Sequence, residues 1–137
     1  MKASRLDVLL SWLLLLIVDV ATACGGFPAV HRLVRRISVR PRAYEASATP
    51  VIAATNDAIN RAAVWYPRPM QCLPRSAAAT WLLRRRGVPA VMVIGVRKMP
   101  FYAHAWVEVG GRVVNDTQQV QALYPAIDRL APVEARR

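Results

Sequence analysis

The 137-residue sequence predicts an α+β fold, with a helical N-terminal half and one further helix packed on a small antiparallel sheet. Two observations predict this class. Apolar residues recur at helical spacing through the first half of the chain, and β-branched runs separated by turn residues follow after residue 90. The length suits one domain, expected over 1–137, with a helical part at 1–66 and the chemistry-bearing core at 72–116.

The N-terminal segment predicts an apolar helix over residues 4–23 that a Gly-Gly pair then ends. Its basic start and the small residues before Cys24 also resemble a secretory signal, even a lipoprotein one. Asp7 and Asp19 flank the apolar run and disfavour that interpretation. A helix of this kind either is buried in a core or lies on a membrane surface.

Two further stretches of the N-terminal half have helical patterns. Residues 28–37 predict a short helix and 38–48 a linker. Thr49 is a good N-cap, with proline at the first helical position, for a helix that runs to about residue 65. The best-defined helix is 73–86, which ends in three arginines followed by a glycine and a proline.

The second half of the chain predicts the sheet. Residues 90–96 form an apolar, β-branched strand, 103–109 a second strand and 112–116 a third. The pattern weakens afterwards: 118–130 suit a short helix, and 132–137 a frayed tail.

The charge and the cysteine content limit the kinds of partner and the roles of the thiols that we expect. The net charge of +11, almost all from arginine, suits an anionic partner: nucleic acid, an anionic membrane surface or an acidic peptide. Two cysteines, Cys24 and Cys72, are too few for a disulfide framework. An exported protein would allow one bridge, whereas a cytosolic one favours a reactive thiol and a bystander.

Cys72 opens the best-defined helix, where unpaired N–H groups favour a thiolate. Arg75 in the same turn would add to this effect. His104 lies on the second strand, with Tyr102 and Trp106 on its own face. Taken singly, the cysteine and the histidine also suit ordinary structural roles.

The hairpin that follows His104 decides whether Asp116 lies beside it. A two-residue Gly-Gly loop would place the two side chains on opposite faces of the sheet. A three-residue loop over 109–111 pairs them directly and sets Glu108 against Arg112. We therefore predict the three-residue loop, which brings carboxylate and imidazole together.

These three residues supply the roles of nucleophilic acyl transfer. Cys72 would be the nucleophile, His104 the base and Asp116 the group that orients it. An acyl group on the sulfur, a thioester, would then be released by water.

The run from Cys72 to Asp116 resembles the leader-peptidase B proteins of lasso-peptide biosynthesis, transglutaminase-like and papain-related cysteine peptidases. The matching pieces are CLPRS, RRRGVPA, IGV and AHAWVEVGGRVVND. The resemblance implies a transglutaminase-like core, a Cys72–His104–Asp116 triad and no cofactor or metal. Substrate contacts are expected from residues near the triad: Gln71, Arg75, Tyr102 and Trp106.

The resemblance also implies a cytoplasmic enzyme that removes the leader from a ribosomally made lasso precursor. The residues before Cys72 are too few for a fused leader-recognition domain beside the peptidase's own helices, so a stand-alone peptidase is expected. Its partners would be the precursor peptide, a separate leader-recognition protein and an asparagine-synthetase-like cyclase. Peripheral membrane contact through residues 4–23 stays open.

Other functions remain alternatives. The triad also suits a transglutaminase-like acyltransferase that delivers the acyl group to an amine. Arginines at 32–42 and 84–86 suit a nucleic-acid-binding module, but no aromatic residues interleave with them, so no nucleic acid partner is expected. A membrane-bound protein built on Cys24 is another alternative. The cysteines and histidines lack metal-ligand spacing.

Overall fold

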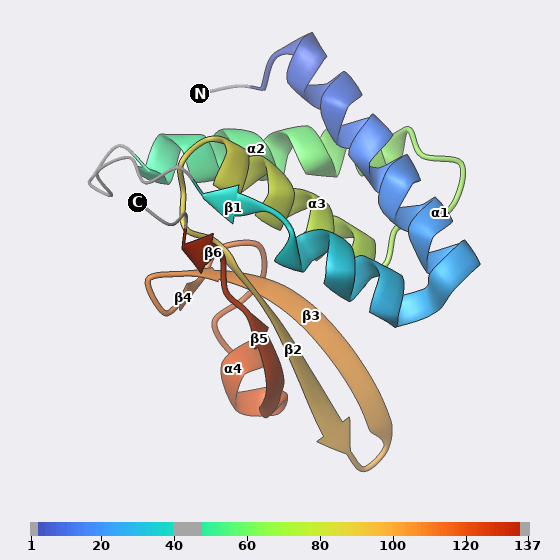
Figure 1. Ribbon diagram of the computed structural model, residues 1–137, viewed down its shortest axis with the longest axis vertical. Coiled ribbons are helices and arrows are strands. Elements are labelled where there is room, and N and C mark those ends of the chain that lie inside the picture. The colour runs from blue at the N-terminus through green and yellow to red at the C-terminus, as the bar shows by residue number, and fades with distance from the viewer. Residues whose placement is uncertain (1–2, 40–47, 135–137) are drawn as a thin grey trace.

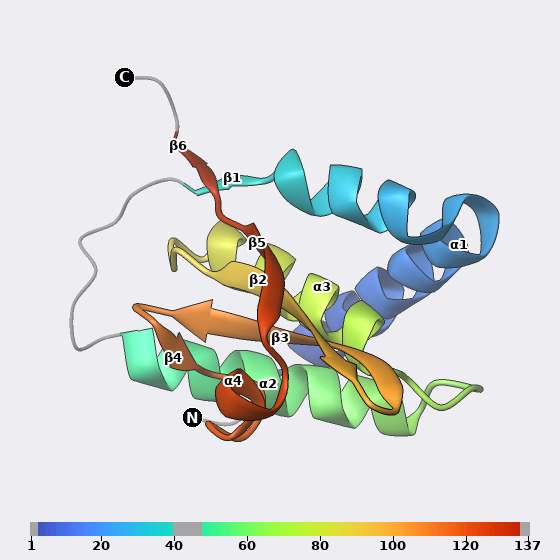
Figure 2. The same cartoon turned by 90° about the horizontal axis from the view of Figure 1, so that it is seen from below.

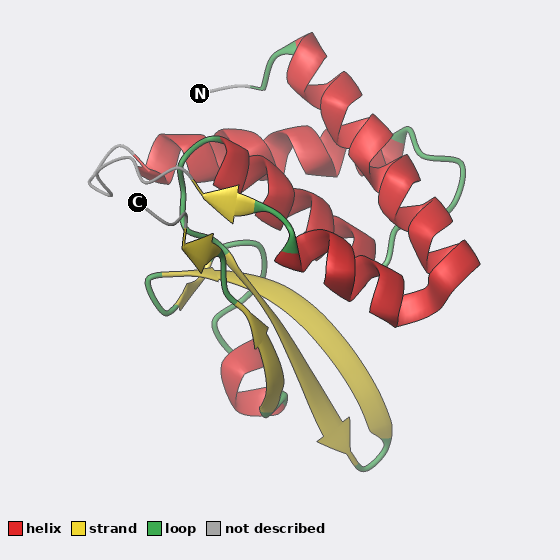
Figure 3. Ribbon diagram, in the orientation of Figure 1, coloured by secondary structure: helices red, strands yellow, loops and turns green. Residues whose placement is uncertain are grey.

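The structure, a computed structural model, describes residues 3–39 and 48–134 (Figure 1). Three helices form one layer: α1 (Arg5–Arg35), α2 (Ala48–Val64) and α3 (Cys72–Arg85). An antiparallel sheet of order β4-β3-β2-β5 forms the other, as Figure 3 shows. Its strands are β2 (Val91–Lys98), β3 (Phe101–Val109), β4 (Arg112–Val113) and β5 (Ala126–Leu130). The α+β class is confirmed.

Shorter elements complete the fold. Helix α4 (Val120–Leu123) lies between β4 and β5 in the chain. Strand β1 (Ser38–Val39) pairs in parallel with β6 (Val133–Glu134), so the chain after α1 lies beside the chain after β5. Most of the predicted linker, 40–47, lies outside the described residues.

Helix α1 is two helical stretches joined by a bend at Gly26, which has a φ of 63° (Figure 1). The predicted helices at 4–23 and 28–37 are therefore confirmed, with the break at the glycine pair. A capping box begins α1: the Ser4 hydroxyl accepts from the Asp7 N–H, and the Asp7 carboxylate accepts from the Ser4 N–H. Leu15 and Val18 are buried against the rest of the protein.

Helices α2 and α3 begin and end close to the predicted positions. Helix α2 begins at Ala48, so Thr49 lies inside its first turn and the prediction that Thr49 is the N-cap is wrong. Helix α3 begins at Cys72, with Gln71 as N-cap residue in extended conformation. Gly87, with φ of 85°, ends it in the left-handed region.

The sheet separates two packing layers because successive side chains alternate between its faces. Met92, Ile94 and Ala105 pack with residues of α1 and α3. Val93 and Trp106 point the other way and pack with Val113 of β4 and Val120 of α4. Figure 2 shows α4 on the side of the sheet away from α3.

The β3–β4 hairpin corrects the predicted register. Val109 pairs with Arg112, so the loop has two residues, not three. Gly110 and Gly111 have φ values of 58° and 78°, the pair of left-handed conformations that a type I′ turn requires. The predicted register assumed that pairing continues along the strand as far as residue 116. In the structure β4 pairs with β3 at two residues only, so side chains beyond Val113 do not constrain the register.

The sequence also missed strand β5, where only a short helix was expected. Helix α4 accounts for four residues of that stretch, and β5 then pairs antiparallel with β2. Two adjacent charged residues, Asp128 and Arg129, interrupt the alternation of apolar and polar residues that would indicate a strand. The edge position of β5 explains this, because only Leu130 in it is buried.

Arg84 is a buried charge, 1% exposed. Its guanidinium donates to the carbonyl oxygens of Val34, Ile37, Ala90 and Leu130 at 2.5–3.2 Å. Burial lowers its pKa to about 10. Arg84 belongs to the 84–86 run considered for nucleic-acid binding. It lies in the interior instead, where it joins α1, α3 and β5.

Candidate active site

His104 and Asp116 lie in direct contact. His104 Nε2 is 2.7 Å from Asp116 Oδ2, and both side chains are partly exposed. The other carboxylate oxygen, Oδ1, accepts from the N–H of Thr117 at 2.7 Å. Asp116 thus engages one ring nitrogen and leaves Nδ1 as the nitrogen that can accept a proton from a nucleophile.

Asp116 reaches His104 from a bend rather than from a strand. After β4 the chain turns at residues 114–116. The bend is held to β3 by two bonds at one residue: the Val114 N–H donates to the Val107 carbonyl at 2.9 Å, and the Val107 N–H donates to Asn115 Oδ1 at 2.8 Å. The predicted proximity of the two side chains is present, although the predicted register is not.

Two aromatic rings flank the His104 imidazole. Its centroid is 5.1 Å from that of Tyr124 and 6.2 Å from that of Trp106, and both pairs are stacked. Gly95 pairs with His104 across the β2–β3 ladder. A Cβ at Gly95 would lie 2.6 Å from the Tyr124 carbonyl oxygen and 2.7 Å from Trp106 Cη2, so only glycine lets both approach.

Glu108 holds the Trp106 indole in place through a hydrogen bond. Its carboxylate is buried and accepts from Trp106 Nε1 at 2.9 Å, Gln121 Nε2 at 2.8 Å and Arg129 Nη1 at 2.7 Å. Burial raises the pKa of Glu108, but the three hydrogen bonds and the Arg129 charge together hold it below its usual value. The predicted Glu108–Arg112 pair is wrong, since Glu108 pairs with Arg129.

Cys72 is the first residue of α3 and is partly buried, packed beside the cluster that contains Ala77 and Ala105. At the start of α3 the N–H groups of Cys72 and Leu73 have no intrahelical acceptors, whereas Pro74 has no N–H and the Arg75 N–H donates to the Gln71 carbonyl at 3.4 Å. Among the described residues, no hydrogen bond joins the Cys72 thiol to His104 or Asp116.

A single buried hydroxyl connects the three elements that carry Cys72, His104 and Asp116. Ser76, one turn after the cysteine, donates to the Ala105 carbonyl at 3.0 Å, next to the histidine. Asn115 Nδ2, next to the aspartate, donates to Ser76 Oγ at 3.1 Å. These two bonds join α3, one turn after Cys72, to the residues next to His104 and Asp116.

A cleft of about 300 Å³ opens beside Asp116, between α2, α3 and the bend. Its lining is rich in amide groups and contains one guanidinium, from Asn56, Asn60, Asn115 and Arg75. Arg75 donates through Nη2 to Asn60 Oδ1. These groups can donate and accept hydrogen bonds along an extended peptide.

The remaining predicted substrate residues differ in exposure. Gln71 is exposed at the start of α3, and Tyr102 is exposed on β3 with the Arg97 guanidinium 5.8 Å from its ring centre. Trp106 is 1% exposed, so substrate contact through it is not supported. The Trp106 ring instead packs in the cluster with Val93 and Val120 and stacks beside the His104 ring.

Sequence reasoning missed Ser76 and Tyr124. Ser76 stands among alanines four residues after Cys72, a spacing that places it on the same helix face. That spacing could have identified it. Tyr124 lies far along the chain after a weak pattern, and only the fold brings it to His104.

Other features of the described residues bear on the alternatives. Cys24 and Cys72 are both free thiols. Among residues 3–39 and 48–134, no three His, Cys, Asp or Glu side chains are close enough to hold a metal ion. His31 lies 3.0 Å from Asp128, so each described histidine has a carboxylate partner.

Comparison with known proteins identifies the fold family. The model of the transglutaminase-like superfamily matches residues 14–128. Over 50 residues, 36% of the chain, the sequence is 50% identical to the microcin J25-processing protein McjB of Escherichia coli. The chain spans about a quarter of that relative's length, since the match covers 24% of it. No solved structure matches the chain significantly. Because the family model covers most of the sequence, from the middle of α1 to β5, this chain belongs to the transglutaminase-like superfamily.

Proposed function

We propose that this protein is a cytoplasmic cysteine peptidase that removes the leader from a lasso-precursor peptide. The observation that carries the proposal is the His104–Asp116 pair, held beside the helix that begins with Cys72. The family match and the identity to a microcin-processing protein support the pathway.

The proposed reaction begins with Cys72 as nucleophile. His104 accepts the thiol proton at Nδ1 while Asp116 holds Nε2–H and stabilises the imidazolium. The sulfur attacks the scissile carbonyl, and the free N–H groups of Cys72 and Leu73 stabilise the oxyanion. His104 then protonates the leaving amine, which leaves a thioester on Cys72. Water, deprotonated by His104, releases the leader as its carboxylate.

The cleft beside Asp116 is the proposed path of the peptide. Arg75, Asn60 and Asn115 line it and would bond the peptide main chain or an acidic side chain. Gln71 and Tyr102, both exposed, would contact the peptide at the edges of the site. In the same proposal a separate leader-recognition protein delivers the precursor, and an asparagine-synthetase-like cyclase uses the freed amine.

Cleavage of a precursor peptide by purified variants, with the leader-recognition protein present, tests the proposal. Cys72→Ala should abolish cleavage, and Asp116→Asn should lower kcat about 10²- to 10⁴-fold because the imidazolium loses its carboxylate. Cys24→Ala and Thr117→Ala are matched controls, expected to keep full activity. Full activity of folded Cys72→Ala would end the peptidase proposal. Mass analysis with an added amine separates hydrolysis from acyl transfer.

A further inference from the structure

Helix α1 carries an apolar stripe that faces away from the protein. Its members recur every three or four residues and are 36–64% exposed: Leu6, Leu9, Leu10, Leu13, Leu16, Ile17 and Val20. From first to last they cover about 21 Å of helix. An apolar surface of this extent on one side of a helix indicates an interaction site.

The opposite face of α1 is tied to the body of the protein. Leu15 and Val18 are buried. Asp7 forms an ion pair with Arg86 at 2.8 Å, and Asp19 accepts from the Tyr66 hydroxyl at 2.8 Å. By length and composition α1 could cross a membrane. Crossing a membrane would separate α1 from the protein and break these contacts. We therefore expect α1 to stay packed on the protein with its apolar stripe exposed.

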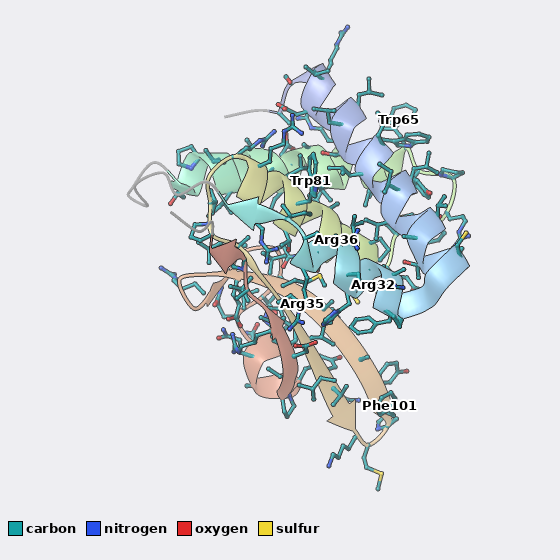
Figure 4. All side chains as sticks on the ribbon, viewed as in Figure 1. Arg32, Arg35, Arg36, Trp65, Trp81 and Phe101 are labelled. Atoms are coloured by element: carbon teal, nitrogen blue, oxygen red, sulfur yellow. The ribbon has the colours of Figure 1, made fainter. Side chains whose placement is uncertain are left out.

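A second apolar area continues the stripe at the end of α2. Val64 and Trp65 are about four-fifths exposed, and Figure 4 shows Trp65 alongside the first half of α1. A groove of about 330 Å³ lies here, with Val64 and Trp65 on one side and Arg5 and Arg61 among its other lining residues. Exposed tryptophan beside arginine is typical of side chains at a membrane–water interface.

Within the described residues of α1 and α2, the charges that lack an ion-pair partner are positive. The carboxylates of α1 and α2 are each paired with an arginine: Asp7 with Arg86 at 2.8 Å, Asp19 with Arg68 at 3.3 Å and Asp57 with Arg61 at 3.1 Å. Arg5 is exposed at one end of α1. Beyond the bend at Gly26, three more exposed arginines, labelled in Figure 4, lie at the end of α1: Arg32, Arg35 and the C-cap residue Arg36.

We propose that this α1–Trp65 face docks on the surface of an anionic bilayer, with the stripe among the acyl chains and the arginines at the phosphates. Apolar burial and attraction to anionic headgroups are the two contributions that hold such helices in an interface. A second copy of the chain is disfavoured as occupant, because each copy has a net charge of +11. The proposal does not depend on peptidase activity.

Co-sedimentation of the full chain with lipid vesicles tests it. Wild type should sediment with phosphatidylcholine vesicles containing about one-third phosphatidylglycerol and stay largely in solution with phosphatidylcholine alone. Leu9→Gln/Leu13→Gln should weaken binding at least about tenfold, since two large apolar side chains lose their burial. Raising salt should also weaken binding.

Matched controls are Leu123→Gln on α4 and Ile127→Gln on β5, which are as exposed but lie off the stripe. Both should bind like wild type, and circular dichroism checks that all variants are folded. No binding to anionic vesicles, or equal loss in stripe and control variants, overturns the proposal. Sedimentation of wild type as a dimer that the stripe variant abolishes, without vesicle binding, assigns the face to a second copy.

Discussion

Gly95 determines how tightly His104 is surrounded. It lies opposite the histidine on β2, and both flanking rings approach the place where a side chain would begin. The imidazole is held by stacking on two sides and by Asp116 at Nε2. Its orientation therefore depends on a residue that has no side chain.

Gly95→Ala should disturb this arrangement without touching any reacting group. The added methyl would meet the Tyr124 backbone at 2.6 Å, so Tyr124 or Trp106 must move. We expect a loss of about 1–3 kcal/mol in the free energy of unfolding, as overpacked sites show. If the proposed peptidase function holds, kcat should fall while the protein remains folded. Urea denaturation and cleavage assays measure both, and unchanged values would contradict the role of Gly95.

At the scale of elements, Arg84 and Ser76 perform different tasks. Ser76 joins α3 to β3 and to the bend that carries Asp116. Arg84 joins the other end of α3 to the end of α1 and to β5 through backbone carbonyls alone. A guanidinium suits this because its planar donors point in several fixed directions.

Arg84→Met should destabilise the fold by about 3–5 kcal/mol, because buried carbonyl groups lose their donor. Arg84→Lys should recover only part of this, since an ammonium cannot reach all four carbonyls. Arg85→Met is the control: Arg85 is exposed over the Trp81 ring, 5.1 Å from its centre. Its loss should cost about 0.5 kcal/mol. Thermal unfolding distinguishes them, and equal effects would contradict this account.

At the scale of the whole molecule, stability should fall in acid. The pKa of Glu108 lies below its usual value of 4.5 in the folded protein, and hydrogen bonds from Ser4 likewise lower that of Asp7 from 3.8. On unfolding both return to their usual values, so the unfolded chain binds more protons. Their contribution is complete above about pH 5 and is lost as pH falls through the lowered values.

Glu108→Gln tests the contribution of this carboxylate to the pH dependence. At pH 7 the variant should be about 1–3 kcal/mol less stable, because the charged acceptor of Trp106, Gln121 and Arg129 is gone. The difference from wild type should shrink as pH falls below 4. Denaturant unfolding at several pH values measures it, and parallel curves for both proteins would contradict the assignment.

Elements that depend on interactions between neighbouring residues were predictable, whereas elements that depend on contacts between distant residues were not. Helix α3 was predictable within a residue because its proline, arginines and Gly87 act on neighbouring backbone. The β3–β4 register was not, since cross-strand pairing was extrapolated through residues 114–116, which leave the sheet. Strand β5 was hidden because it pairs along β2 with mostly exposed side chains.

The sequence by itself determined the helical half, the β2–β3 hairpin and the residue types available for acyl transfer, because local periodicity and turn residues encode them. Only the tertiary structure decided that Asp116 meets His104 from a bend, that Ser76 and Tyr124 support the site, and that Arg84 is interior. The reason is physical: these contacts join residues distant in the chain, and their energies depend on burial that no local pattern specifies.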